Sequence, residues 1–98
     1  MIALIWRYEV RDEHRAAFEA AYGPEGDWAQ LFSRSGGFRG TELLRAQDGS
    51  YLTLDVWRAR TDFDAFISDH HADYEALDLR TQAWTHAEHR LGEYAVLG

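Results

Sequence analysis

Residues 2–10, IALIWRYEV, constrain the fold most, because this segment has the pattern of a β-strand with two apolar faces. Side chains of a strand alternate between its faces, so the even-numbered residues, which are all apolar or aromatic, share one face. On the opposite face Ala3 and Ile5 are apolar, and only Arg7 and Glu9 are charged. A strand that is apolar on both faces is usually covered on both. We therefore expect it inside a sheet that is covered on each side.

Two helical regions are expected after this strand. Residues 12–22 have apolar side chains at helical spacing, with Asp12 as a candidate N-cap and Gly23 as a left-handed C-terminal cap. A loop, GPEGD, follows, and Asp27 is placed to cap a short helix that carries Trp28, Leu31 and Phe32. Gly36 and Gly37 are expected to end that short helix.

The second half of the chain predicts a hairpin, a long helix and a last strand. Residues 38–47 and 51–59 have strand patterns, and Asp48-Gly49 between them is typical of a type I′ turn. A helix is expected from Thr61, with Asp64 completing a capping box. Its apolar stripe consists of Phe63, Phe66, Ile67, His70, Tyr74 and Leu77. Thr85 and Glu88 suggest a second capping box and a short helical segment over 85–91, before a strand at 93–97.

The expected order of elements is β-α-β-β-α-β, which is the ferredoxin-like pattern. It predicts an α+β fold in which one antiparallel four-stranded sheet carries helices on one face. A chain of 98 residues suits a single domain over residues 1–98. Since the strands at 2–10 and 51–59 are apolar on both sides, a second copy of the sheet is expected on the uncovered face. The protein is therefore predicted to be a homodimer.

Charge and composition exclude several classes of partner. The formal net charge is −7, which disfavours nucleic acid and anionic membranes, since both attract Lys and Arg. The chain has no cysteine, so it has no thiol nucleophile and no Cys metal ligand. No apolar run approaches the roughly 20 residues of a membrane span. The first residues lack the basic start and cleavage site of a signal peptide, so a cytoplasmic location is expected.

A candidate site begins at the strand YLTLDVW, residues 51–57, which places Asp55 beside Trp57 on an aromatic face. The apolar stripe of the following helix must face the sheet and carries His70. We predict that the carboxylate of Asp55, the indole of Trp57 and the imidazole of His70 converge on one cavity as catalytic groups. The expected substrate-binding residues are aromatic side chains around it: Trp6, Tyr8, Tyr22, Trp28, Phe32 and Tyr74.

This combination suggests a chemical role. A carboxylate that pairs with a histidine fixes the imidazole tautomer and raises its basicity, so His70 could remove a phenolic proton near neutral pH. The resulting phenolate can pass an electron to O₂, while the aromatic rings hold a planar hydrophobic molecule. Structural roles remain open as alternatives. His70 is then a hydrogen-bonded core histidine, Asp55 is a tether to a backbone N–H or an arginine, and the tryptophans are core packing.

Histidines elsewhere raise the question of a metal. His70, His71 and Asp73 are close in sequence, and His86 and His89 would lie one turn apart on a helix. Adjacent helical residues point about 100° apart, and the chain has no HExxH motif. We therefore expect no metal site.

Several of these features together resemble the antibiotic biosynthesis monooxygenase-like family of the dimeric α+β barrel superfamily, over nearly the whole chain. They are the order of elements, the first-strand core Trp6-Arg7-Tyr8, and the segments FEAAYGPEGDWAQLF, GTELLRAQDGSYLTLDVW and DFDAFISDHHADYEALD. The resemblance implies a homodimer whose two sheets pack face to face. It also implies a pocket in each subunit between the sheet and the helices.

The family resemblance implies one main activity and two alternatives. The main one is oxidation of a planar aromatic molecule by O₂ without metal or flavin, so the resemblance implies that no cofactor is needed. The alternatives are a haem-binding or haem-degrading protein and a non-catalytic dimeric module that binds a hydrophobic ligand. Trp57 matches the family's tryptophan on the third strand. Trp6 replaces the first-strand Asn of haem-degrading members, and Thr53 stands where some members have an Asn.

Overall fold

The strand with two apolar faces, β1 (Ile2–Val10), lies in the interior of a four-stranded antiparallel sheet. The computed structural model describes all 98 residues, and the strand order is β2-β3-β1-β4. The remaining elements are a 3₁₀ helix η1 (Asp12–His14), α1 (Arg15–Tyr22), α2 (Asp27–Phe32), β2 (Phe38–Arg45), β3 (Tyr51–Trp57), α3 (Arg60–Asp69), α4 (His71–Gln82) and β4 (Thr85–Ala95). The predicted ferredoxin-like α+β fold is confirmed.

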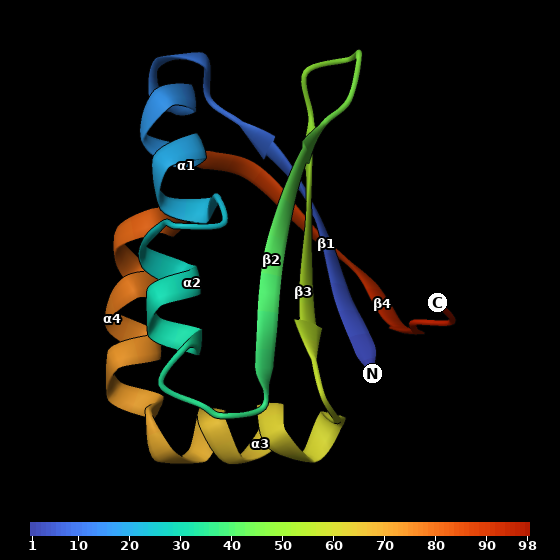
Figure 1. Ribbon diagram of the computed structural model, residues 1–98. Helices are drawn as coiled ribbons and strands as arrows, with labels where there is room; N and C mark the ends of the chain where they lie inside the picture. Colours follow the sequence, from blue (N-terminus) through green and yellow to red (C-terminus); the bar gives the residue numbers. More distant parts are fainter.

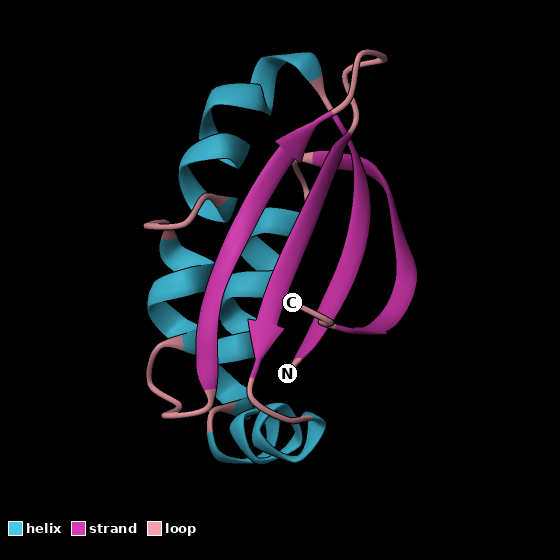
Figure 2. Ribbon diagram, turned by 45° about the vertical axis from the view of Figure 1, so that its right-hand side comes forward, coloured by secondary structure: helices cyan, strands magenta, loops and turns pink.

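The helices all lie on one side of the sheet, as Figure 1 shows, and α3 crosses the end at which β1 begins and β3 ends. Figure 2 shows the opposite face of the sheet without any helix over it. The even-numbered residues of β1 and the odd-numbered residues of β3 face the helices, and Leu4, Tyr8, Tyr51 and Trp57 belong to the buried core. This is the face on which the sequence pattern predicted the site.

The long helix expected from Thr61 is interrupted. It consists of α3 and α4, and His70 between them has φ −124° and ψ 28°, which is not helical. The predicted caps are also wrong: neither Asp12 nor Thr61 caps a helix, because the residues at the N-cap positions are others and form no side-chain cap hydrogen bond. Gly23 follows α1 in an extended conformation, with φ −73°, so it is not a left-handed cap.

The short helical segment expected over 85–91 is wrong, because residues 85–95 form β4. This strand pairs antiparallel with β1 along its length, with register shifts between Ile5 and Trp6 and between Glu9 and Val10. The spacing of Thr85 and Glu88 fits a capping box, but pairing with the exposed edge of β1 satisfies the backbone groups of the whole segment at once. Tertiary pairing therefore overrode the local signal.

The hairpin joins β2 and β3 as predicted, but its turn is not type I′. That type needs positive φ at both central residues, whereas only Gly49 has positive φ, at 89°. Asp48 instead accepts hydrogen bonds from the backbone N–H and the hydroxyl of Ser50, at 2.9 and 2.6 Å. The carboxylate thus stabilises a wider loop between the strands.

Candidate functional site

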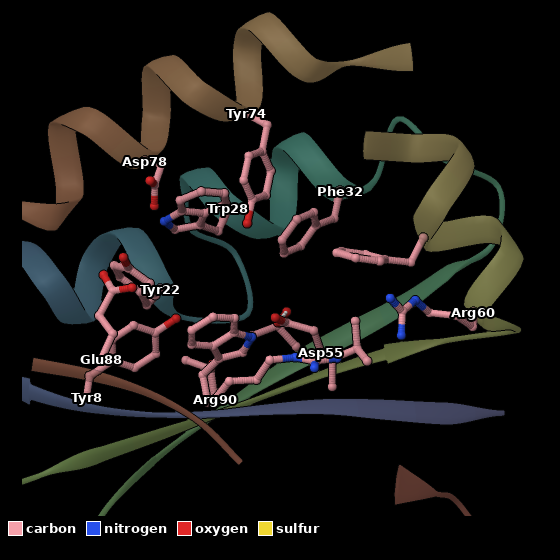
Figure 3. Close-up of a pocket in the computed structure, with 15 residues that line it drawn as sticks. Tyr8, Tyr22, Trp28, Phe32, Asp55, Arg60, Tyr74, Asp78, Glu88 and Arg90 are labelled. Atoms are coloured by element: carbon pink, nitrogen blue, oxygen red, sulfur yellow. Dashed lines mark hydrogen bonds between the residues drawn. The ribbon is translucent and has the colours of Figure 1, made fainter. Parts of the chain in front are cut away.

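A cavity of about 320 Å³ lies between the sheet and the helices (Figure 3). Its walls are contributed by β1, β2, β3 and β4 from the sheet side and by α1, α2, α3 and α4 from the other. Aromatic rings form most of the apolar wall, and charged or hydroxyl side chains interrupt it. The polar members are Thr41, Thr53, Asp55, Arg60, Asp78, Glu88 and Arg90.

The aromatic part of the wall contains all six side chains that the sequence indicated as substrate-binding. They are Trp6, Tyr8, Tyr22, Trp28, Phe32 and Tyr74. Neighbouring rings contact one another, with centroid distances of 5.1 Å between Tyr8 and Tyr22 and between Trp28 and Tyr74. The wall is therefore a continuous aromatic surface that suits a planar ligand. That these residues bind a substrate remains a prediction.

Asp55 is the carboxylate at the floor of the cavity. The strand register places it between Leu4 of β1 and Thr41 of β2. The Thr41 hydroxyl donates a hydrogen bond of 2.6 Å to Asp55 Oδ1, and no other side chain hydrogen-bonds this carboxylate. Burial disfavours the charged form and raises the pKa of Asp55 to about 6, although the Thr41 hydrogen bond acts in the opposite direction. Neither His70 nor an arginine, the partners that the sequence suggested, forms a hydrogen bond with the Asp55 carboxylate.

The tyrosine hydroxyls around the cavity are weak acids. Burial and the nearby Asp78 carboxylate raise the pKa of Tyr74 to about 12. Burial also raises the pKa values of Tyr8 and Tyr22 above the usual value of a phenol. Tyr22 donates a hydrogen bond of 3.1 Å to the hydroxyl of Thr81 on α4. These hydroxyls can therefore donate hydrogen bonds to a ligand, but they stay protonated at neutral pH.

Sequence reasoning missed the charged groups at the two ends of the cavity. Arg60 is engaged with Asp64 at 2.9 Å and Glu93 at 3.0 Å. Asp78 and Glu88 lie at the opposite end, near Tyr22 and Tyr8 (Figure 3), and neither forms an ion pair or a side-chain hydrogen bond. Asp78 follows Tyr74 by one helical turn, so the sequence could have placed it on the same side of the helix as Tyr74. Glu88 was hidden because its segment was expected to be helical, whereas in β4 it pairs with Tyr8.

Trp57 lies outside the cavity wall, although it is only two residues from Asp55 on the same face of β3. It is completely buried, with ring centroids 5.2–5.6 Å from those of Phe32, Phe38, Phe63 and Phe66. Its Nε1 is buried without a hydrogen-bond partner. The structure therefore gives Trp57 the surroundings of a core residue.

His70 also lies outside the cavity wall. It occupies the break between α3 and α4, where its ring centroid is 5.1 Å from that of Phe66 and its side chain forms no hydrogen bond. A continuous helix would have kept His70 and Tyr74 on one stripe, but the break directs them differently. The structure consequently does not bring Asp55, Trp57 and His70 to one cavity.

The remaining histidines do not form a cluster. No group of three or more His, Cys, Asp or Glu side chains is close enough to hold a metal ion. His86 and His89 lie on β4 instead of a helix, and His89 Nε2 is 3.1 Å from a carboxylate oxygen of Glu9. None of the helices has the length and apolar character needed to cross a membrane.

Comparisons with known proteins agree with this architecture. The family model described as antibiotic biosynthesis monooxygenase matches residues 1–77. No curated protein matches the chain significantly. Among solved structures, a mutant of SnoaB, a cofactor-independent oxygenase from Streptomyces nogalater, is 24% identical with a TM-score of 0.74, over 99% of this chain and 93% of that chain.

Two further solved structures have the same fold at lower identity. A protein assigned as an antibiotic biosynthesis monooxygenase from Nitrosomonas europaea is 16% identical with a TM-score of 0.72, and the match covers 100% of both chains. A mutant of MhuD with two manganese protoporphyrin IX molecules bound per active site is 20% identical with a TM-score of 0.69, over 100% of this chain and 96% of that chain. At these identities the likeness establishes the fold alone.

Proposed function

The chain belongs to the antibiotic biosynthesis monooxygenase family, and from this premise we propose that it binds a planar aromatic molecule in its cavity and oxidises it with O₂ without a cofactor. The observation that carries the proposal is Asp55, the carboxylate on the floor of a cavity whose apolar wall is mostly aromatic. A similar fold in a cofactor-independent oxygenase, SnoaB, is consistent with it. Residues 1–98 would act as one domain.

Asp55 is the group that we assign to proton transfer. A pKa of about 6 leaves this carboxylate ionised at neutral pH and more basic than an ordinary aspartate. Its Oδ1 is held by Thr41, and its Oδ2 accepts no hydrogen bond within the chain, so Oδ2 is available to a ligand. His70, which we expected to be the base, does not border the cavity, and the proposal no longer needs it or Trp57 for catalysis.

The chemistry needs only the substrate, O₂ and this base. Asp55 removes a proton from an acidic phenol or a carbon activated by aromatic rings, and the resulting anion gives one electron to O₂. Recombination of the two radicals and return of the proton yield a hydroperoxide, which loses water to leave a carbonyl group. In sum, a CH₂ group and O₂ become C=O and H₂O. For a phenol, one ring C–H, the O–H and O₂ become two carbonyl groups and H₂O. General-base help is worth about 10²–10⁴-fold, so the substrate's own reactivity supplies the rest.

Haem is a poorer candidate for this cavity. Iron of a haem is normally held by His, Cys, Met or Tyr, and no histidine, cysteine or methionine borders the cavity. Its tyrosines have raised pKa values, which disfavours their binding a metal as phenolates. The residues present therefore do not fit haem as a resident group.

We also propose that the helix-free face of the sheet is covered by a second copy of the chain. Ile5, Leu52, Leu54 and Val56 form its half-buried apolar centre, and Leu44 and Tyr94 are exposed near its edges. Light scattering after gel filtration should give the mass of a dimer, and Leu54→Arg should give a monomer. A monomeric wild-type protein would contradict the proposal. A cytoplasmic location remains a prediction.

O₂ uptake with a panel of anthrones and quinols tests the proposed activity. We expect uptake with at least one compound and a loss of at least about 100-fold in Asp55→Asn. Asp69→Asn, an equal charge change at an exposed residue outside the cavity, is the matched control and should keep full activity. Binding without any uptake would favour the non-catalytic module, and uptake that survives in Asp55→Asn would remove Asp55 from the mechanism.

A further inference from the structure

One end of the cavity carries two carboxylates that have no partner in the protein. Asp78 projects from α4 and Glu88 from β4, and Figure 3 shows both at the end occupied by Tyr8 and Tyr22. Neither carboxylate takes part in an ion pair, and no side chain donates a hydrogen bond to either. Asp78 is also close enough to Glu88 to contribute, with burial, to a raised pKa of Glu88. Asp78 is half-buried and Glu88 is exposed at the cavity mouth, so the hydrogen-bond donors to these two carboxylates come from solvent or from a ligand that displaces it.

Trp28 gives a second, independent indication at the same end. The side chain borders the cavity and is only 7% exposed, and its Nε1 is buried without a hydrogen-bond partner. The Tyr22 oxygen is the candidate acceptor within the protein, since a weak hydrogen bond from the Trp28 indole lowers the pKa of Tyr22, but the two groups lack the geometry of a full hydrogen bond. Figure 3 shows the ring nitrogen on the side nearest Asp78. An indole N–H is a donor only. Unlike the Nε1 of Trp57, which is enclosed by the core, this N–H borders the cavity and can donate to an acceptor on a ligand.

The arginines of the cavity do not neutralise this end. Arg60 is at the other end and is already paired with Asp64 and Glu93. Figure 3 shows the Arg90 side chain extending toward Asp55 and away from Glu88. An anionic ligand group beside Asp78 and Glu88 would therefore meet like charges without a compensating cation.

From this arrangement we infer that the Asp78–Glu88 end of the cavity binds a hydrogen-bond-donating, non-anionic group of the aromatic ligand, either a hydroxyl or a protonated amine. The inference deepens the proposed function and depends on it, since the aromatic body of the same ligand would lie over Asp55. A hydroxyl donates to a carboxylate and also accepts from the Trp28 N–H. An ammonium group satisfies the two carboxylates and gains from the surrounding aromatic faces. A carboxylate group on the ligand could accept a hydrogen bond from the Trp28 indole, but it could donate none to Asp78 or Glu88.

Three matched probes test this inference: naphthylmethanol, naphthylmethylamine and naphthoate, with dissociation constants measured by NMR titration. The double variant Asp78→Asn with Glu88→Gln should weaken binding of the alcohol and the amine by about tenfold each, which is the effect of losing one charge-assisted hydrogen bond. Naphthoate should bind as before or more tightly. The control is Asp69→Asn with Glu25→Gln, which removes two exposed carboxylates outside the cavity and should change none of the three.

Trp28→Phe separates the two donor groups, because it keeps an aromatic ring and removes the N–H. We expect Trp28→Phe to weaken the binding of naphthylmethanol several-fold and to leave the binding of naphthylmethylamine unchanged. Equal changes for all three probes in the Asp78/Glu88 variant, or no change, would overturn the inference while aromatic binding itself stands. If the wild-type protein binds none of the probes, the proposed function fails, and the inference fails with it.

Discussion

Two aromatic regions on the same face of the sheet have opposite characters. The first, which we call the Trp57 cluster, consists of Trp57, Phe32, Phe38, Phe63 and Phe66, and its rings pack without a cavity around a fully buried tryptophan. The second is the cavity above Asp55, two residues earlier on the same strand. Phe32 and Phe63 border both regions. Aromatic composition alone therefore does not distinguish a core from a site.

The helices account for the difference. α3 brings Phe63 and Phe66 directly onto Trp57, whereas α4 packs against α2 and α3. Ion pairs of Arg34 with Asp73 and of Arg80 with Asp27 connect α4 to the segment around α2. From there α4 reaches the cavity through Tyr74 and Asp78. The space that α4 leaves over β3 is the cavity, and it contains the polar groups that a packed core would exclude.

The largest expected effect is in the Trp57 cluster. Trp57→Ala should lower the free energy of unfolding by about 3–5 kcal/mol, because it removes a completely buried ring and leaves a void. Trp6→Ala should cost less than half as much, since Trp6 is half-buried and already borders empty space. Urea denaturation measures both. Equal losses would mean that the two regions are packed alike.

In the cavity, Asp55→Asn should stabilise the protein at neutral pH by up to about 3 kcal/mol. The pKa of Asp55 is about 6 in the folded protein and about 3.9 in an unfolded chain, so the folded state holds this proton more tightly. The wild-type protein therefore loses the contribution of Asp55 to its free energy of unfolding as the pH rises from about 4 to about 6.

The gain from Asp55→Asn should consequently be absent below about pH 4 and complete above about pH 6. Thermal unfolding of both proteins across this range measures it, with Asp69→Asn as the control. A variant that is less stable than the wild-type protein at pH 7.5 would show that the ionised carboxylate is favourably solvated.

A smaller effect separates two tyrosines of the cavity. Tyr22→Phe should lower the free energy of unfolding by about 1 kcal/mol, because it leaves the buried hydroxyl of Thr81 without its donor. The matched change Tyr74→Phe should be close to neutral, since the Tyr74 hydroxyl forms no hydrogen bond within the protein. Chemical denaturation distinguishes them, and a Tyr74→Phe loss as large as that of Tyr22→Phe would indicate a bridging partner.

The smallest effect is expected for His70, which belongs neither to the Trp57 cluster nor to the cavity wall. His70→Ala should change the free energy of unfolding by less than about 1 kcal/mol, because the residue is half-buried and its side chain has no hydrogen bond. It should also leave O₂ uptake unchanged. A large loss of uptake with unchanged stability would return His70 to the mechanism.

Alternation along β1 and β3 predicted correctly which side chains face the helices, since that choice depends only on the period of a strand. The same alternation therefore placed Trp6, Tyr8 and Asp55 on the correct face of the sheet. The prediction for His70 depended on a helix that continues past residue 69, and no local signal in "FISDHHADY" marks the break. The capping-box pattern of Thr85 and Glu88 wrongly predicted a helical segment for a similar reason, because it is a local pattern and does not report the pairing of this segment with β1.

The sequence by itself determined the coarse β-α-β-β-α-β order, the sheet faces and the aromatic character of the site, because these follow from residue periodicity over short stretches. Only the tertiary structure decided that Asp55 borders a cavity whereas Trp57 is completely buried. It also decided that Thr41 is the hydrogen-bond partner of Asp55, and that Asp78 and Glu88 lie at the same end of the cavity. These depend on strand register and on the break between α3 and α4 at His70. Both are set by packing between segments far apart in the chain, which no local pattern encodes.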